Sequence, residues 1–159
     1  MVIRWRYRHH AAYGMTTAYD ESAGHIKRYL PEGEIDFVVA NPLLKDPFES
    51  TTLLDRAIVL ERSSEIVAKK MWHRGNLATA RDLFDFATLY LHDPGAIEEA
   101  SPFFPRHAHA FLQHISARQP VMRAGFDAID RRDFTLSFDE CQGIAESILR
   151  PLLAAHDDS

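Results

Sequence analysis

The 159-residue chain has too few cysteines for a disulfide or a cysteine-rich zinc site, because Cys141 is its only one. We expect Cys141 to lie on a C-terminal helix as a small apolar residue. No apolar stretch approaches the ~18 residues that cross a bilayer, so we expect no membrane partner. The N-terminal segment MVIRWRYRHH lacks the apolar centre of a signal peptide. These two features predict a cytoplasmic protein.

The chain also lacks an excess of positive charge. It carries 18 basic and 23 acidic residues, and the net charge of -5 gives no support to non-specific nucleic-acid binding by the whole surface. A local basic patch is compatible with this balance, because residues 1–10 contain three arginines and no acid. The hydrophobic content of 46% is ordinary for a globular protein and predicts a single domain over residues 1–159.

The first part of the chain has the patterns of β-strands. Residues 1–10 alternate apolar and basic side chains, and a period of two is typical of a strand. Segments 25–30 and 34–40 are predicted as two further strands, joined by a hairpin turn around Pro31-Glu32-Gly33. Residues 42–54 are predicted as a loop. A last short strand is expected over the following residues, 57–61.

From Ser63 onward the pattern is helical. Ser63 is expected to cap the first helix, and Thr79 with Asp82 the second. Ser137 with Glu140 forms the same kind of cap before the last helix. The predicted helices cover residues 63–74, 80–92, 95–100, 106–117, 120–131 and 138–153. The fold class is therefore α+β, with a small antiparallel sheet followed by a C-terminal helical bundle.

Two adjacent lysines, Lys69 and Lys70, lie late in the helix predicted over 63–74. Adjacent residues are ~100° apart around a helix, so the two ammonium groups cannot both point at one site. Glu65 precedes Lys69 by four residues, the spacing of a favourable ion pair, and this places Lys69 on the solvated face. Lys70 follows Ile66 by four residues, on a stripe that begins with an apolar side chain. We therefore predict Lys70 as the inward-pointing cation; two solvated lysines are the alternative.

Asp82 and Asp85, three residues apart, share one face of the next helix. Two carboxylates so close repel one another and need a compensating cation, which an ammonium group or a metal ion can supply. Asp82 has a structural alternative, because with Thr79 it can cap the helix. Asp85 has the alternative of an ion pair with Arg81, four residues before it. The Gly-Asn turn at 75–76 can bring the ammonium group and the carboxylates to one place.

Asp36 is a third acidic candidate and lies in the strand predicted over 34–40. A carboxylate inside the otherwise apolar run IDFVV must be solvated, paired or bound to a metal ion. Asp36 is therefore a candidate metal ligand. A position on the polar face of an edge strand is the alternative.

The segment EIVAKKMWHRGNLATARDLFDFA at 65–87, with GEIDFVVANP upstream, resembles the AbiEii/AbiGii toxin-type nucleotidyltransferases. These proteins belong to the polymerase-beta-like nucleotidyltransferase superfamily. A lysine helix followed by the pattern R-D-L-[FY]-D carries the resemblance. The family lysine falls on Lys70, the arginine–aspartate pair on Arg81 and Asp82, and the last aspartate on Asp85.

The resemblance implies transfer of a nucleoside monophosphate from a nucleoside triphosphate, with Mg²⁺ as cofactor and the 3′ end of tRNA as an acceptor. It also implies a toxin role beside an antitoxin protein. On this basis Lys70 is a catalytic residue that binds the triphosphate, and Arg81 contacts the phosphates. Asp82 and Asp85 are catalytic residues that support or activate the acceptor, while Asp36 corresponds to a metal-binding acid. A lysine suits a triphosphate as a point cation, and Mg²⁺ needs only one or two carboxylates beside the phosphates.

The chain departs from the family pattern ahead of Asp36. The Gly-Ser turn and the Asp-x-Asp pair of the superfamily do not occur there. We therefore expect an N-terminally shortened family member, with a β-rich partial nucleotidyltransferase core over 1–61 and a helical part over 62–159. Such a chain is expected to be weak or inactive as an enzyme. The alternative is a catalytically inactive binding or dimerisation module on the same scaffold, with a partner protein or a second copy bound.

Overall fold

The computed structural model describes residues 19–30, 33–131 and 133–157, and the strand predicted over 1–10 lies outside them. The chain divides into two compact units, Met1–Asn41 and Pro42–Ser159. The described residues form a three-stranded sheet, a two-stranded sheet and six α-helices, and both sheets are antiparallel. The predicted α+β class is confirmed.

The first unit contains the three-stranded sheet, in the order β1-β2-β3. Its strands are β1 (Tyr19–Ser22), β2 (His25–Leu30) and β3 (Gly33–Val38). Strands β2 and β3 pair from Leu30 with Gly33 to His25 with Val38, so the predicted hairpin is confirmed. Strand β1 was not predicted. It turns into β2 at Gly24, whose φ of 79° favours glycine.

The second unit begins with a hairpin of β4 (Phe48–Leu53) and β5 (Arg56–Glu61). The expected strand over 57–61 is confirmed, whereas the expectation of a loop throughout 42–54 was wrong. The two turn residues, Leu54 and Asp55, have φ angles of 49° and 60°. A two-residue turn with both φ angles positive is normally marked by asparagine or glycine, so this sequence gives little sign of it. The predicted β-rich part over 1–61 includes residues 57–61. In the structure, the β4–β5 hairpin lies in the same compact unit as the helices.

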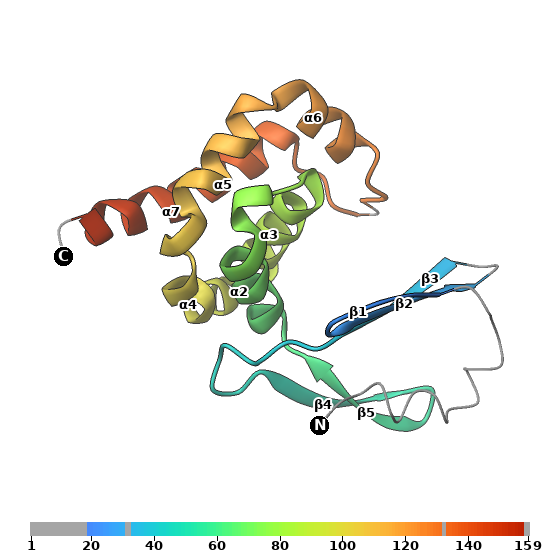
Figure 1. The fold of residues 1–159 in the computed structure, drawn as a ribbon. Helices are drawn as coiled ribbons and strands as arrows, with labels where there is room; N and C mark the ends of the chain where they lie inside the picture. Colours follow the sequence, from blue (N-terminus) through green and yellow to red (C-terminus); the bar gives the residue numbers. More distant parts are fainter. Residues whose placement is uncertain (1–18, 31–32, 132, 158–159) are drawn as a thin grey trace. The chain divides into compact units, whose positions relative to one another are not determined.

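The remaining elements of the second unit are helical (Figure 1). They are α2 (Ser63–Arg74), η2 (Gly75–Leu77), α3 (Ala80–His92), α4 (Pro94–Ala100), η3 (Ser101–Phe103), α5 (Pro105–Ala117), α6 (Gln119–Asp127) and α7 (Phe138–Asp157). The six predicted helices are therefore present, with boundaries shifted by a few residues. None of the helices in the described residues is both long and apolar enough to cross a membrane.

Local caps position the helices that matter for the site. Thr79 and Asp82 form the predicted capping box at the start of α3. Ser137 and Glu140 cap α7 in the same way. The prediction for Ser63 was wrong, because Arg62 occupies the cap position of α2 and no side chain caps that end.

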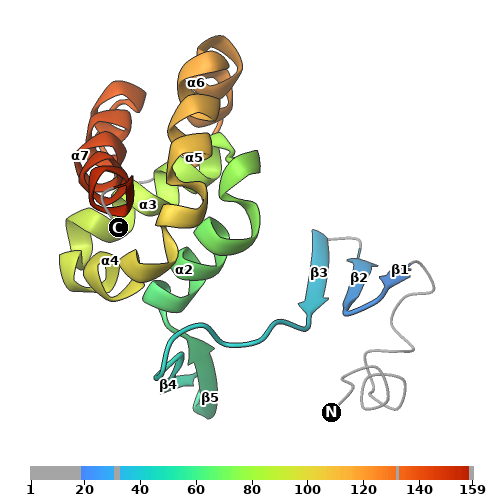
Figure 2. The same ribbon diagram turned by 60° about the vertical axis from the view of Figure 1, so that its left-hand side comes forward.

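The core of the second unit lies between the helices. Its largest buried side chains are Phe86 on α3, Phe104 just before α5, Phe111 on α5 and Phe126 on α6. Helix α7 packs against α5 and α3, as Figures 1 and 2 both show. Cys141 on α7 is fully buried, as expected, and burial raises the pKa of its thiol to about 11.

Helix α5 also lies close to the short turn η2 that separates α2 from α3. A Cβ atom added to Gly75 would lie 2.8 Å from the Cβ atom of His107. Only glycine permits this close approach without a shift of α5. The packing of α5 against η2 therefore helps to set the geometry between α2 and α3.

Candidate functional site

Lys70 on α2 lies between two aspartates of α3. Its Nζ atom is 3.1 Å from Oδ1 of Asp82 and 2.5 Å from Oδ2 of Asp85. The prediction that Lys70 meets both carboxylates is therefore confirmed, while the roles of these three residues in chemistry stay predictions. We call Lys70, Arg74, Arg81, Asp82 and Asp85 the Lys70 cluster.

Asp82 is the most buried member of the Lys70 cluster, with a side chain that is 6% exposed. Its Oδ2 atom accepts hydrogen bonds from the backbone N–H of Thr79 at 2.9 Å and from the Thr79 hydroxyl at 2.7 Å. Burial raises the pKa of Asp82, but the hydrogen bonds from Thr79 and the charge of Lys70 outweigh burial and hold the pKa below its usual value. Asp82 therefore both caps α3 and binds Lys70. The helix cap and the pairing with a cation, which are alternatives at the sequence level, are both present.

Asp85 is less buried and pairs with cations on both sides. Its Oδ1 atom lies 3.0 Å from Nε of Arg81, the i,i+4 pair that the sequence allowed. Its Oδ2 atom contacts Lys70. Arg74 completes the cluster, with its guanidinium 3.3 Å from Oδ2 of Asp82. The sequence reasoning missed Arg74, although its spacing of four residues from Lys70 places both side chains on one face of α2.

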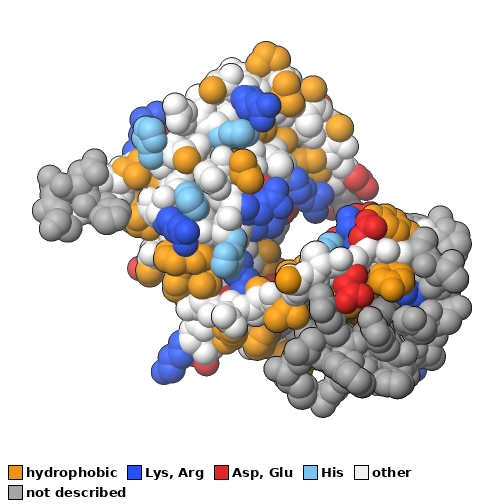
Figure 3. Space-filling view, in the orientation of Figure 1, with side chains coloured by type: hydrophobic (Ala, Val, Ile, Leu, Met, Phe, Trp, Pro, Cys, Tyr) orange, Lys and Arg blue, Asp and Glu red, His pale blue; other side chains and the backbone are white. Residues whose placement is uncertain are grey.

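The Lys70 cluster has one more cation than it has carboxylates, and its two arginines are exposed. The side chains of Arg74 and Arg81 are 49% and 62% exposed. Figure 3 shows Lys and Arg side chains gathered on the face of the helical unit, with several His side chains around them. The local excess of positive charge contrasts with the net charge of -5 for the whole chain. The cluster is therefore arranged to attract an anion.

The same contacts make the cluster a poor metal site. Each of the four carboxylate oxygens of Asp82 and Asp85 contacts an N–H or O–H donor or a cation. Within the described ranges, no three His, Cys, Asp or Glu side chains come together in a way that could hold a metal ion. Asp82 and Asp85 therefore have no carboxylate oxygen left for a metal ion, while Mg²⁺ as a cofactor stays a prediction.

Lys69 has a different set of partners from those of Lys70. Its Nζ atom lies 2.5 Å from Glu61 and 3.0 Å from Glu65, so the predicted i,i+4 pair with Glu65 is confirmed. The prediction of a solvated Lys69 was wrong, because its side chain is 15% exposed against 25% for Lys70. The strand that leads into α2 supplies Glu61 and covers the ammonium group. We call Glu61, Glu65 and Lys69 the Lys69 cluster.

Glu65 binds the chain segment that precedes the hairpin. Its fully buried carboxylate accepts hydrogen bonds from the backbone N–H groups of Leu43 and Leu44, the shortest of them 2.8 Å long. Burial raises the pKa of Glu65, but these N–H donors and Lys69 together outweigh burial and lower it. The Lys69 cluster therefore joins a loop, a strand and a helix.

Asp36 lies in the first unit, on strand β3. Its carboxylate contacts Nε2 of His25 at 3.0 Å and lies 3.7 Å from Nζ of Lys27. Both partners are on the neighbouring strand β2, and all three side chains are at least partly exposed. The alternative of a paired acid on a polar strand face therefore explains Asp36 locally. Its role as a metal ligand stays a prediction.

No protein-family model, curated protein or solved structure matches this chain. The resemblance to the toxin-type nucleotidyltransferases therefore stays a prediction from the residues at 65–87 and the strand upstream of them.

Proposed function

We propose that the Lys70 cluster binds the phosphates of a nucleoside triphosphate and that the chain acts as a nucleotidyltransferase of the toxin type. The acceptor in this proposal is an RNA such as tRNA, the site of action is the cytoplasm, and an antitoxin protein is the regulatory partner. The observation that supports it most is Lys70 lying between Asp82 and Asp85, because the two aspartates fix the ammonium group in place.

The donors of the cluster suit a polyphosphate. An ammonium group has three N–H donors, and the two aspartates engage two of them, which leaves one for a phosphate oxygen. Arg81 uses Nε to bind Asp85, so its terminal nitrogens remain for a second phosphate. Arg74 adds a third cation on the same side of α2.

The proposal builds no Mg²⁺ site from Asp82 and Asp85, because their carboxylate oxygens are already engaged. We expect the ion to arrive with the triphosphate, which already provides oxygen ligands. Transfer by these 159 residues is expected to be weak, because no Asp-x-Asp pair occurs before Asp36. Binding of the triphosphate is therefore the property to measure first.

Isothermal titration of the chain with ATP or GTP and Mg²⁺ tests the proposal. We expect the Lys70→Ala variant to bind at least about tenfold more weakly, which corresponds to about 1.4 kcal/mol. Lys45→Ala is the matched control, because it removes one exposed lysine from the same unit without touching the cluster. Equal affinities for the wild type and Lys70→Ala would contradict the proposal. Transfer of label from an α-³²P-labelled nucleotide to tRNA would then test the chemistry.

The second candidate function is a catalytically inactive dimerisation module, and the hairpin β4–β5 favours it. The strands and their turn expose large apolar side chains, with Phe48 52%, Leu54 88% and Val59 69% accessible. Exposed apolar surface of this kind is typical of an interaction site. Size-exclusion chromatography with light scattering over a range of concentrations tests this candidate. A mass of 18.2 kDa at every concentration would contradict it.

A further inference from the structure

A pocket opens between α2 and α3, next to the Lys70 cluster. It has a volume of about 360 Å³ and is lined by Ile66, Val67 and Leu89 among others. Asp85 also lines this pocket, although its carboxylate binds Lys70 and Arg81. The phosphate-binding groups and the pocket therefore share a wall.

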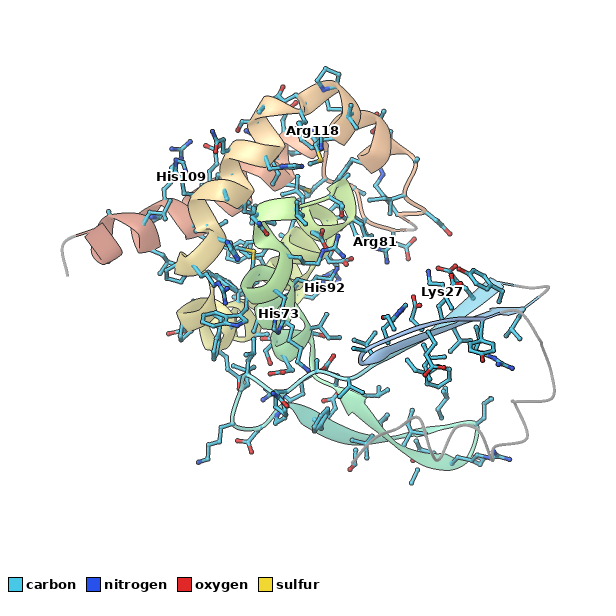
Figure 4. The ribbon with its side chains drawn as sticks, viewed as in Figure 1. Lys27, His73, Arg81, His92, His109 and Arg118 are labelled. Carbon is cyan, nitrogen blue, oxygen red and sulfur yellow. The ribbon has the colours of Figure 1, made fainter. Side chains whose placement is uncertain are left out.

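The two sites follow each other along α3. Arg81 lies at the start of the helix and His92 at its end, and both are labelled in Figure 4. With a rise of about 1.5 Å per residue, the eleven steps between them span about 16 Å. His92 lines the pocket, whereas Arg81 belongs to the cluster. An extended nucleotide has a comparable length.

The pocket combines apolar walls with two polar groups that have spare hydrogen-bonding capacity. The Oγ1 atom of Thr88 is buried, and within the described part of the chain it has no hydrogen-bond partner. A buried hydroxyl without a partner costs about 1–3 kcal/mol and calls for an explanation. Threonine has two accessible χ1 rotamers in a helix, so a rotation about χ1 can turn this hydroxyl toward a ligand in the pocket.

The second polar group is the imidazole of His92. Its Nδ1 atom lies 2.8 Å from the backbone carbonyl of Thr88. A carbonyl oxygen only accepts hydrogen bonds, so Nδ1 must carry the proton. In the neutral ring, Nε2 is then an acceptor for an N–H group of a ligand.

We propose that this pocket holds the nucleobase of the nucleoside triphosphate whose phosphates bind the Lys70 cluster. A base has two apolar faces and a polar edge with N–H donors and acceptors. It therefore matches the apolar side chains of Ile66 and Leu89 and the polar groups of Thr88 and His92. This inference rests on the proposed function, since it needs the phosphates to lie at the cluster.

The first experiment separates the base from the phosphates. Inorganic tripolyphosphate and each of ATP, GTP, CTP and UTP are titrated into the chain in the presence of Mg²⁺. We expect at least one nucleotide to bind about tenfold or more tightly than tripolyphosphate. If tripolyphosphate binds as tightly as each of the four nucleotides, the nucleobase inference is overturned while the proposed function stands. If tripolyphosphate and the nucleotides all fail to bind, both are overturned.

A variant that fills the pocket locates the base. Ile66 is 38% exposed, so Ile66→Trp can occupy the pocket without disturbing the core. We expect it to weaken nucleotide binding about tenfold and to leave tripolyphosphate binding unchanged. Leu91→Trp is the matched control, because Leu91 is 48% exposed on α3 and is not among the residues that line the pocket. Equal loss in both variants, or no loss in Ile66→Trp, would overturn the inference.

The Thr88→Val variant distinguishes a ligand-binding hydroxyl from a structural one. Valine has nearly the same shape and removes the buried hydroxyl that lacks a partner. We expect the melting temperature to stay equal or to rise, while nucleotide affinity falls several-fold and tripolyphosphate affinity does not change. A lower melting temperature with unchanged affinity would assign the hydroxyl to the fold and contradict its part in the pocket.

Discussion

The adjacent lysines of α2 each lie between two carboxylates, yet their surroundings differ in burial and in charge. The Lys69 cluster contains one cation and two acids, and its central carboxylate, that of Glu65, is fully buried. The Lys70 cluster contains three cations and two acids, and two of the cations, Arg74 and Arg81, are 49% and 62% exposed. The first cluster has its charges satisfied by the chain itself, whereas the second has cationic groups left for an anion.

This difference shows what separates a structural ion pair from a candidate site. In the Lys69 cluster the extra negative charge is met by backbone N–H groups of Leu43 and Leu44. In the Lys70 cluster the extra positive charge faces solvent through Arg74 and Arg81. A buried pair whose partner is removed is costly, while an exposed pair contributes little to stability. Substitution of Glu65 in the first cluster should therefore change stability, and substitution of the exposed Arg74 or Arg81 in the second should change binding.

Replacement of Glu65 by alanine gives the largest expected effect. It leaves the N–H groups of Leu43 and Leu44 and the ammonium group of Lys69 without their shared acceptor. We expect a loss of about 3–5 kcal/mol in the free energy of unfolding, measured by urea denaturation. Glu61→Ala is the control, because Glu61 binds the same lysine but is 34% exposed, and it should cost about 1 kcal/mol or less. Similar losses in the two variants would break the distinction between the buried and exposed partners.

Acid should weaken the fold through the lowered pKa values of its buried carboxyl groups, Glu65 and Asp82. Glu65 and Asp82 both have pKa values below their usual 4.5 and 3.8 in the folded chain. As the pH falls, these two carboxylates therefore take up protons at a higher pH in the unfolded chain than in the folded chain. Their contribution to stability is complete above about pH 4.5 and is lost as the pH falls through the folded-state pKa values. Urea denaturation between pH 7 and pH 3 measures this slope. In Glu65→Gln the slope should be shallower, and an unchanged slope would show that Glu65 does not contribute to it.

The parts of this structure that the sequence predicted are those with local signals. The capping boxes of α3 and α7 depend on residues three apart, and the meeting of Lys70 with Asp82 and Asp85 depends on one short turn. Strand β4 was missed because Leu54 and Asp55 adopt left-handed angles without glycine or asparagine. The burial of Lys69 and Glu65 was missed because segments outside α2 supply Glu61, Leu43 and Leu44, which helical spacing alone cannot reveal.

Replacement of Arg81 by alanine gives the smallest expected change in stability and therefore the sharpest test of the Lys70 cluster. Arg81 is 62% exposed and forms an i,i+4 pair with Asp85, so its loss should cost about 0.5 kcal/mol or less. Arg150 forms an i,i+4 pair with Glu146 on α7 and is 66% exposed, which makes Arg150→Ala a matched control.

Both variants should unfold at nearly the same urea concentration, but only Arg81→Ala should bind tripolyphosphate more weakly, by several-fold at low salt. Because the two arginines have the same kind of partner and nearly the same exposure, a difference in affinity cannot come from a lost ion pair. It must come from the position of Arg81 beside Lys70. Equal affinities would instead place the anion elsewhere and make the Lys70 cluster a structural contact like the Lys69 cluster.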